Sequence, residues 1–399
     1  MTVENTPIRV FQVATGNVGT EMIKRIGNHP DLELVGLHCY TPEKIGRDAG
    51  EIVGLDPIGV VAAGSVDDII AARPDVVTYH GVFPDEDLYV KVLEAGINIV
   101  TTADWITGHH RDRNHPHPSG KPTTTVLEEA CRKGGATFYG TGMNPGLTQI
   151  LGIVQTCDAA ELENVTVIEP VDVSCHHSVG SWEMCGYGRP VDDPELPGML
   201  EKGTRVFADG VHLMADCFGL ELDDVVFDYE LGACTRDVDL GWYKLPKGSL
   251  GANYLKYQGV VDGAPKVEVH VEWQMTPHAE PHWNVQGCYI TKIKGDPCVA
   301  SKHRVLPRPG TDFSSPRGVR VRRYDGDRSA RPQCHPFGGR RTAERDHQCR
   351  SPAARIRRPL QVVGRSSATS SPTRASSSSR MGRTASMSRP RGSGTSHSR

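Results

Sequence analysis

The sequence lacks the cysteine spacing of a zinc site or of a disulfide framework. Its 11 cysteines are scattered along 399 residues, and no two of them form a C-x-x-C pair. In a chain of this length, such scatter argues against a structural zinc site and against a disulfide-stabilised secreted fold. The thiols fit a reducing compartment, so we expect a cytoplasmic location.

Long apolar runs are also missing. No stretch approaches the roughly 20 apolar residues that cross a bilayer, so we expect no membrane partner. Residues 1–7 are polar and do not combine a basic start with an apolar run, so we expect no secretory signal. With 37% hydrophobic residues the chain can still bury a sizeable core, and its length suits two domains better than one.

Lysine is nearly absent from the last hundred residues. Residues 300–399 contain 22 arginines and one lysine against five acidic residues, so the net charge of -3 conceals a strongly acidic first part. Arg, Ser, Pro and Gly dominate this stretch, which predicts a disordered tail. One interpretation is a nucleic-acid-binding arm. We favour a coding frameshift, because natural basic arms usually mix lysine with arginine, and we expect no nucleic-acid partner.

The first half of the chain alternates strand-like apolar runs with amphipathic helix-like segments. We expect strands at 8–13, 32–38, 75–79, 97–101 and 136–139, with helices near 18–26, 85–95 and 124–133. This alternation predicts a parallel sheet with helices on its faces. We therefore expect an α/β domain over residues 1–145, an α+β domain over 146–299 and a disordered tail over 300–399.

A glycine-rich turn directly follows the first expected strand. In the run V-A-T-G-N-V-G over residues 13–19, Ala14 stands where the dinucleotide fingerprint G-x-G-x-x-G has its first glycine. Gly16 lets the backbone approach a pyrophosphate, and Gly19 lets helix and strand pack closely. The alternative is an ordinary glycine turn. We expect a Rossmann-type domain whose cofactor contacts here are Thr15, Gly16, Asn17, Val18 and Gly19.

The end of the second expected strand lacks the acid that would hold the ribose hydroxyls of NAD. The chain reads H-C-Y-T over residues 38–41, and two cations, Lys44 and Arg47, follow closely. Cations at this place can pair with the 2′-phosphate of NADP. We therefore predict NADP as the cofactor, with NAD as the alternative if both cations are simply solvated.

Polar residues follow the strands expected at 97–101 and 136–139. In open α/β sheets ligands bind outside the carboxyl ends of the strands, which places Asp104 and Thr102 beside a cofactor. Asp104 is our candidate general acid/base, with a pKa raised by partial burial, and a helix cap is the alternative. We expect Asn144, in the run T-G-M-N-P-G over 141–146, at the nicotinamide edge or else in a turn that begins a helix.

Histidines gather in two places. The first is a long polar loop over residues 104–122 that contains His109, His110, His115 and His117. This loop has no cysteine and no consistent carboxylate partner, so we interpret it as a solvated loop or lid and predict no metal. Further along the chain we expect a substrate pocket, or else a structural pair at a strand end, formed by His176, His177 and Trp182.

Four segments together resemble a known family. V-A-T-G-N-V-G, T-P-E-K-I-G-R-D-A-G, T-T-A-D and G-T-G-M-N-P-G are similar to segments of 2,4-diaminopentanoate dehydrogenase and the native amine dehydrogenases, whose N-terminal domain is dihydrodipicolinate-reductase-like. The resemblance covers about residues 7–298. It implies a Rossmann domain, an α+β substrate and dimerisation domain, and a homodimer. In that family a carboxylate, usually Glu, follows the fifth strand, and Asp104 occupies the matching position.

The resemblance implies NAD(P)H-dependent interconversion of an amine with a ketone and ammonia. Dihydrodipicolinate reductase itself carries a His-His pair followed by a lysine and an A-P-S-G-T-type run. The pair has a counterpart in His176-His177, but residues 178–182 supply neither the lysine nor the run. We therefore expect an amine or carbonyl substrate. The alternatives are reduction of another C=N, C=C or C=O bond and a non-catalytic nucleotide-binding sensor.

Overall fold

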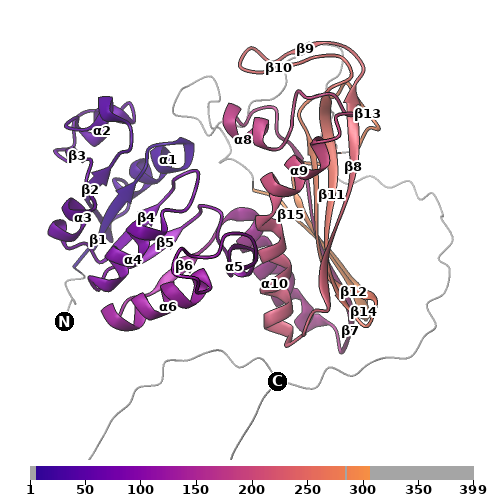
Figure 1. Ribbon diagram of the computed structural model, residues 1–399, viewed down its shortest axis with the longest axis horizontal. Coiled ribbons are helices and arrows are strands. Elements are labelled where there is room, and N and C mark those ends of the chain that lie inside the picture. Colours follow the sequence, from indigo (N-terminus) through magenta and orange to yellow (C-terminus); the bar gives the residue numbers. More distant parts are fainter. Residues whose placement is uncertain (1–5, 284, 306–399) are drawn as a thin grey trace, which may run out of the picture. The chain divides into compact units, whose positions relative to one another are not determined.

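The structure is a computed structural model that describes residues 6–283 and 285–305 (Figure 1). Apart from residues 300–305, the tail predicted to be disordered lies outside the described residues. The described chain forms two main sheets, one built from the first 140 residues and one from residues after 160.

The first sheet has six parallel strands in the order β3-β2-β1-β4-β5-β6. Its strands are β1 (Ile8–Val13), β2 (Leu32–His38), β3 (Ala62–Ala63), β4 (Val76–Tyr79), β5 (Asn98–Thr101) and β6 (Phe138–Gly140). This is the strand order of a doubly wound dinucleotide-binding sheet. The order reverses between β1 and β4, so a crevice is expected at their carboxyl ends.

The connecting segments of the first sheet form helices, one of them 3₁₀. They are α1 (Asn17–Ile26), η1 (Pro42–Lys44), α2 (Ala49–Ile52), α3 (Val66–Ala72), α4 (Glu86–Glu94), α5 (His109–Asn114) and α6 (Thr123–Gly134). Helix α4 shows why they form: the Asp85 carboxylate accepts a hydrogen bond from the Leu88 backbone N–H and caps the helix. Its apolar residues Leu88, Tyr89 and Val92 recur at helical spacing and are buried together.

The second sheet is mixed, with seven strands in the order β13-β8-β11-β12-β7-β14-β15. These strands are β7 (Glu161–Asp172), β8 (Asp224–Cys234), β11 (Leu250–Val261), β12 (Ala264–Gln274), β13 (Ala279–Glu280), β14 (Tyr289–Asp296) and β15 (Val299–His303). Only β7 and β12 pair in parallel, whereas the other pairs are antiparallel. A separate pair consists of β9 (Val238–Asp239) and β10 (Lys244–Leu245).

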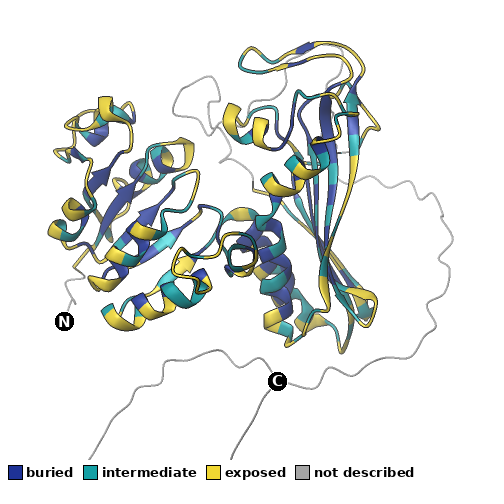
Figure 2. Ribbon diagram, in the orientation of Figure 1, coloured by how far each residue is buried: buried dark blue, intermediate teal, exposed yellow. Residues whose placement is uncertain are grey.

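Helices cover one face of the second sheet. They comprise η2 (Met143–Leu147), α7 (Thr148–Gln155), η3 (Thr156–Asp158), α8 (Val179–Met184), α9 (Leu196–Thr204) and α10 (Val206–Phe218). Helix α10 presents Phe207, Val211 and Met214 to a core that includes Val167 and Val269 of the sheet. Figure 2 shows the buried side of α10 and the buried interior of both sheets in dark blue. The predicted fold class, a Rossmann-type α/β domain followed by an α+β part, is confirmed.

Two local features differ from expectation. The polar loop over 104–122 contains helix α5, and His110 within it is only 3% exposed, so this residue is not solvated. Strand β15 pairs with β14, so regular structure continues past residue 299 to His303. None of the helices in residues 6–283 and 285–305 has the length and apolarity that a bilayer span requires.

Candidate functional site

A cleft of about 770 Å³ opens at the carboxyl ends of β1 and β4, where the strand order reverses. Three groups of residues line it: the turn after β1, the segments after β2 and β4, and part of the polar loop. The lining residues include Thr15, Gly16, Tyr40, Lys44, His80, Asp85, Glu86 and Arg111. The cleft lies where a doubly wound sheet binds a nucleotide.

The turn after β1 has the close approaches that the fingerprint predicts. A methyl group on Gly19 would lie 2.2 Å from the Ala14 carbonyl oxygen, so only glycine lets α1 pack this closely on the turn. A methyl group on Gly16 would meet nothing within 4 Å, so the space before the start of α1 is open. Ala14 has a φ of 70°, which glycine adopts more easily. The free backbone amides at the start of α1 therefore face open space.

The other residues predicted to contact the cofactor differ in their surroundings. The Asn17 amide nitrogen donates to the backbone carbonyl of His177 at 3.5 Å, and Val18 is 53% exposed. The Lys44 ammonium donates to the Thr15 hydroxyl at 2.8 Å and lines the cleft. Arg47 is exposed and is not part of the cleft wall.

Tyrosine and acidic side chains that the sequence did not single out form the opposite wall of the cleft. The Tyr40 hydroxyl lies 3.0 Å from the Asp85 carboxylate, to which it can donate, and the Tyr79 hydroxyl donates to the Phe83 carbonyl oxygen at 2.8 Å. The position of Tyr40, two residues past β2, could have marked it, since that region contacts the ribose in such sheets.

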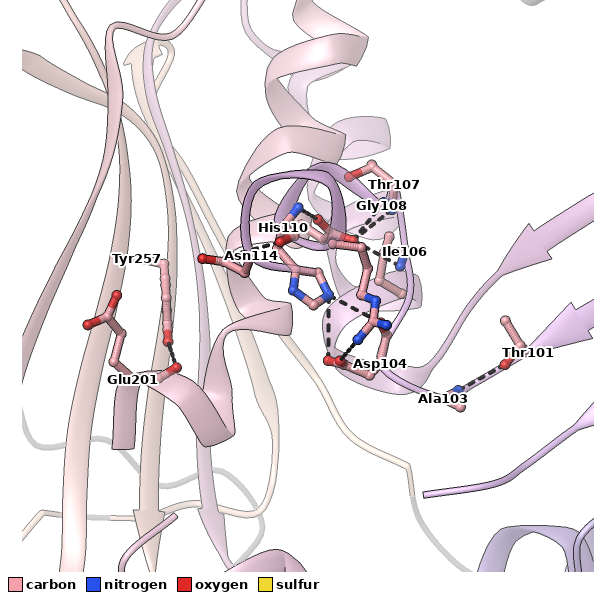
Figure 3. A network of polar contacts seen from close by, with 12 residues as sticks. Thr101, Ala103, Asp104, Ile106, Thr107, Gly108, His110, Asn114, Glu201 and Tyr257 are labelled. Atoms are coloured by element: carbon pink, nitrogen blue, oxygen red, sulfur yellow. Dashed lines mark hydrogen bonds and ion pairs between the residues drawn. The ribbon is translucent and has the colours of Figure 1, made fainter. Parts of the chain in front are cut away.

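Asp104 lies between β5 and α5 and faces two basic side chains (Figure 3). Nε2 of His110 lies 3.5 Å from one carboxylate oxygen, and a guanidinium nitrogen of Arg111 lies 3.4 Å from the other. Burial raises the pKa of Asp104, while the charges of His110 and Arg111 oppose that rise. A raised pKa is the direction of shift that a carboxyl needs in order to act as a general acid/base.

Arg111 connects Asp104 to the cleft. Its second guanidinium nitrogen lies 2.5 Å from Glu86, and both Arg111 and Glu86 line the cleft. Asp104 itself does not line this cavity, but it forms an ion pair with Arg111, which does. Arg111 is therefore the physical link between the cleft and the candidate acid/base.

The segment that carries Asp104 is held by an acid from the second half of the chain. Asp209 of α10 is fully buried, and one of its carboxylate oxygens accepts from the backbone N–H groups of Ile106, Thr107 and Gly108 at 3.2, 3.1 and 2.8 Å. Its other oxygen accepts from the His110 backbone N–H at 2.9 Å. In the sequence, the only indication of this role is that Asp209 is an acid on the apolar face of the segment that forms α10.

Thr102 contacts a histidine of the cleft wall. Its hydroxyl lies 2.9 Å from Nδ1 of His80, which follows β4 and is buried. Burial lowers the pKa of His80 to about 4, so this imidazole is neutral at pH 7. Within the described residues its Nε2 atom has no hydrogen-bond partner. Thr102 therefore positions a neutral histidine that faces the cleft.

The side chain of Asn144 forms three hydrogen bonds with protein groups. Its amide nitrogen donates to Glu169 at 2.5 Å, and its amide oxygen accepts from Gln149 at 2.8 Å and from Thr148 at 3.0 Å. This network fixes the turn over residues 143–147 and occupies the amide oxygen and one N–H of the amide nitrogen of Asn144.

The predicted substrate residues His176, His177 and Trp182 lie around α8. The Trp182 indole N–H donates to the His176 carbonyl oxygen at 2.7 Å, and the Trp182 ring makes an edge contact with Trp273 at 5.4 Å between ring centres. The His177 ring lies 4.9 Å from that of Trp242. None of these residues lines the cleft after β1 and β4. In residues 6–283 and 285–305, no three His, Cys, Asp or Glu side chains are arranged to hold a metal ion.

The strand order and the cleft define a Rossmann-type oxidoreductase. No family model matches the chain. The chain is 28% identical over 297 residues to an amine dehydrogenase of Streptomyces virginiae, covering 71% of this chain and 81% of that protein. It is 22% identical over 292 residues to 2,4-diaminopentanoate dehydrogenase of Acetoanaerobium sticklandii, covering 68% and 77%.

A solved amine dehydrogenase structure from Mycobacterium smegmatis shares the fold. It has a TM-score of 0.60 at 16% identity and covers 75% of this chain and 87% of that one. Matches to 4-hydroxy-tetrahydrodipicolinate reductases cover less than half of each reductase. The resemblance read from the four sequence segments is therefore confirmed: the chain is an amine-dehydrogenase-like oxidoreductase.

Proposed function

We propose that the protein interconverts an amine with a ketone and ammonia, using a nicotinamide cofactor in the cleft at the ends of β1 and β4. The observation that carries this proposal is the Asp104 carboxyl held by Arg111, a residue of the cleft wall, at 3.4 Å. The names of the two relatives, an amine dehydrogenase and a diaminopentanoate dehydrogenase, support the same substrate class.

The residues of the cleft fit a dinucleotide. The open space before Gly16 and the start of α1 suit a pyrophosphate, with contacts from Thr15, Gly16, Asn17, Val18 and Gly19. Lys44 lies in the cleft, where it can pair with a 2′-phosphate, so we propose NADP, with NAD as the alternative. Arg47 lies outside the cleft and adds only longer-range attraction. When bound, the nicotinamide accepts or supplies the hydride.

Asp104 carries the protons of the reaction. In amine oxidation the C–H hydrogen leaves with its electron pair, an iminium forms, and water adds to it as ammonia departs. Asp104 accepts the proton released by the attacking water, and in the reverse direction it donates that proton. Thr102 and the Asn144 turn shape the end of the site nearest the nicotinamide, while His176, His177 and Trp182 form part of the substrate pocket.

We further propose a cytoplasmic homodimer with a cofactor domain over 1–145 and a substrate and dimerisation domain over 146–299. The face of the second sheet opposite its core carries partly buried polar side chains, among them Tyr254, Lys256 and His270. The Tyr254 hydroxyl and Nδ1 of His270 are hydrogen-bonded at 2.8 Å. A second copy of this face would complete their burial, and a monomeric mass by light scattering would contradict the proposal.

Replacement of Asp104 by Asn tests the proposed function. We expect NADPH to bind as before and turnover with a ketone and ammonia to fall about 100-fold or more, because the proton carrier is lost. Glu128→Gln, an exposed acid on α6, is the control and should retain full turnover. Unchanged turnover in Asp104→Asn would remove Asp104 from the chemistry. Ketone reduction that proceeds equally without ammonia would replace the amine reaction by carbonyl reduction.

A further inference from the structure

A carboxyl group interrupts the apolar row of β7. On the covered face of this strand Val165 and Val167 are fully buried and Val171 packs against the same core. Glu169 lies in the same row and is buried, and its partner on β12 is the fully buried Val271. A carboxyl at a position that the strand pattern assigns to an apolar residue lowers stability unless it has a partner.

The groups around Asn144 determine which atom donates in its hydrogen bond to Glu169. The backbone N–H of Gly146 can only donate, and it donates to the Gln149 side-chain oxygen at 2.7 Å. Gln149 therefore turns its amide nitrogen to the Asn144 oxygen, at 2.8 Å. The Asn144 nitrogen is left to donate to one oxygen of Glu169, at 2.5 Å. This oxygen of Glu169 is an acceptor.

The second oxygen of Glu169 is an acceptor as well. The Trp273 indole N–H, which can only donate, lies 3.2 Å from it. Two neutral donors fit a carboxylate but supply no positive charge, and no Lys, Arg or His of residues 6–283 and 285–305 forms an ion pair with Glu169. Burial raises the pKa of Glu169 to about 7. A buried carboxylate without a counter-charge is costly, so this site favours a cation.

The surroundings of Glu169 are aromatic and within reach of a ligand. Besides donating to Glu169, Trp273 contacts Trp182 edge-on at 5.4 Å and Phe207 at 5.6 Å between ring centres. Tyr289 lies on the neighbouring strand β14, next to Ile290, which pairs with Ile168 of β7. Aromatic rings attract cations. Glu169 itself is 9% exposed, and Asn144, Trp273 and Tyr289 are only partly buried.

Glu169 also lies next to the end of the first sheet that carries Asp104. Its partner Asn144 belongs to the turn that follows β6, and β6 pairs with β5. The Thr141 backbone N–H, three residues before Asn144, donates to the Thr101 carbonyl oxygen at 2.8 Å, and Asp104 follows three residues after Thr101. Short stretches of chain therefore connect the two carboxyls.

We infer that Glu169 is the counter-charge for a cationic nitrogen of the substrate, an alkylammonium or iminium group, with Trp273 and Tyr289 as the aromatic walls beside it. The inference rests on the proposed amine reaction for its substrate class, but it concerns binding alone. Glu169 thereby determines specificity: it selects a cationic nitrogen over a neutral group of the same size, while Asp104 carries the proton.

Calorimetric titration of the full chain with n-hexylammonium chloride and with 1-hexanol tests the inference. The two probes share a chain length and differ in charge. We expect wild-type protein to bind the ammonium at least about tenfold more tightly, and Glu169→Gln to abolish the difference. Glu169→Asp keeps the negative charge and should therefore keep most of the preference for the ammonium probe. Glu128→Gln, the exposed acid on α6, is the control and should keep the preference.

Equal binding of the two probes by wild-type protein would overturn the inference, as would a folded Glu169→Gln variant that still prefers the ammonium. If Glu169→Gln does not fold, the pH dependence in the wild type decides. The two residues that hydrogen-bond Glu169, Asn144 and Trp273, do not titrate, and burial moves the pKa of the nearby Tyr289 upwards. The preference of the wild type for the ammonium probe should therefore fall as Glu169 is protonated below about pH 7. A constant preference down to pH 5 would refute the inference.

The binding test of Glu169 and the turnover assay of the proposed function can fail separately. A protein that prefers the ammonium probe but shows no reaction with a ketone and ammonia would contradict the proposed function and support the role of Glu169. A protein that turns over but binds both probes equally would support the proposed function and contradict the role of Glu169.

Discussion

Two carboxyl groups show how single residues acquire different properties from their surroundings. Burial raises the pKa of both Asp104 and Glu169. Asp104 has a guanidinium nitrogen of Arg111 3.4 Å away, whereas Glu169 accepts only from neutral donors. The basic neighbours of Asp104 counteract the rise that burial causes, whereas no cation counteracts it at Glu169, so we propose proton transfer for the first carboxyl and cation binding for the second. Different environments for paired carboxyls are a general device of active sites.

The pH dependence of the reaction should report the contact between Arg111 and Asp104. Amine oxidation needs the ionised form of Asp104, so its rate rises with pH through the pKa of this group. Arg111→Gln removes a cation that lowers this pKa, so we expect the midpoint of the rise in kcat to move about one unit to higher pH. The measurement is kcat against pH at saturating NADP⁺.

A second arginine of the same helix provides the control. Arg113 on α5 is well exposed, and its nearest acid is Asp224 at 3.7 Å. Arg113→Gln should leave the midpoint in place. An unchanged midpoint in Arg111→Gln would show that Asp104 does not govern the rate.

At the scale of elements, helix α5 depends on a cap from a different part of the chain. The backbone N–H groups before and at the start of this six-residue helix converge on Asp209 of α10, about 100 positions later in the sequence. An isolated helix this short is not stable in water. Its position, and with it the positions of His110 and Arg111 next to Asp104, is therefore set by α10.

Replacement of Asp209 by Asn should disturb this arrangement. An amide nitrogen in place of a carboxylate oxygen would face N–H groups that can only donate, and we expect a loss of about 2–4 kcal/mol in the free energy of unfolding. The turnover number should fall as well, because Asp104 is less well held. Urea unfolding and steady-state kinetics measure the two effects.

Another acid of α10 serves as the comparison. Asp216 is exposed, and partial desolvation raises its pKa, so neutralisation by Asp216→Asn should cost little stability. If Asp209→Asn were as stable and as active as Asp216→Asn, the cap on α5 would not matter.

At the scale of the whole molecule, cofactor binding couples the cleft to stability. A ligand that binds only the folded protein stabilises it by about 2.7 kcal/mol at a concentration of 100 times its Kd. Because Lys44 lines the cleft, we expect NADPH to raise the Tm more than NADH at equal concentration. Lys44→Ala should remove most of this difference, whereas Arg47→Ala, outside the cleft, should keep it. Equal shifts with both cofactors in the wild type would exclude a preference for NADP.

Local patterns were enough to predict five of the six strands of the first sheet, but not the two-residue strand β3. Strands β1 and β2 have the expected bounds, because an apolar run next to a turn signal is a property of adjacent residues. The glycine turn was predictable for the same reason, since Gly19 meets Ala14 only five positions away. The charge asymmetry of the tail is also a matter of sequence, and its predicted disorder concerns residues mostly outside those the structure describes.

Contacts between distant residues were not predictable. Asp209 and Gly108 are 101 positions apart, and Glu169 and Trp273 are 104 apart. No local periodicity records such pairs, because the first joins the segment before α5 to α10 and the second joins the neighbouring strands β7 and β12. The sequence by itself determined a Rossmann-type sheet, its glycine turn and the candidate Asp104. Only the tertiary structure decided that Arg111 joins Asp104 to the cleft and that Glu169 is a buried carboxyl without a counter-charge, since burial and pairing depend on the whole fold.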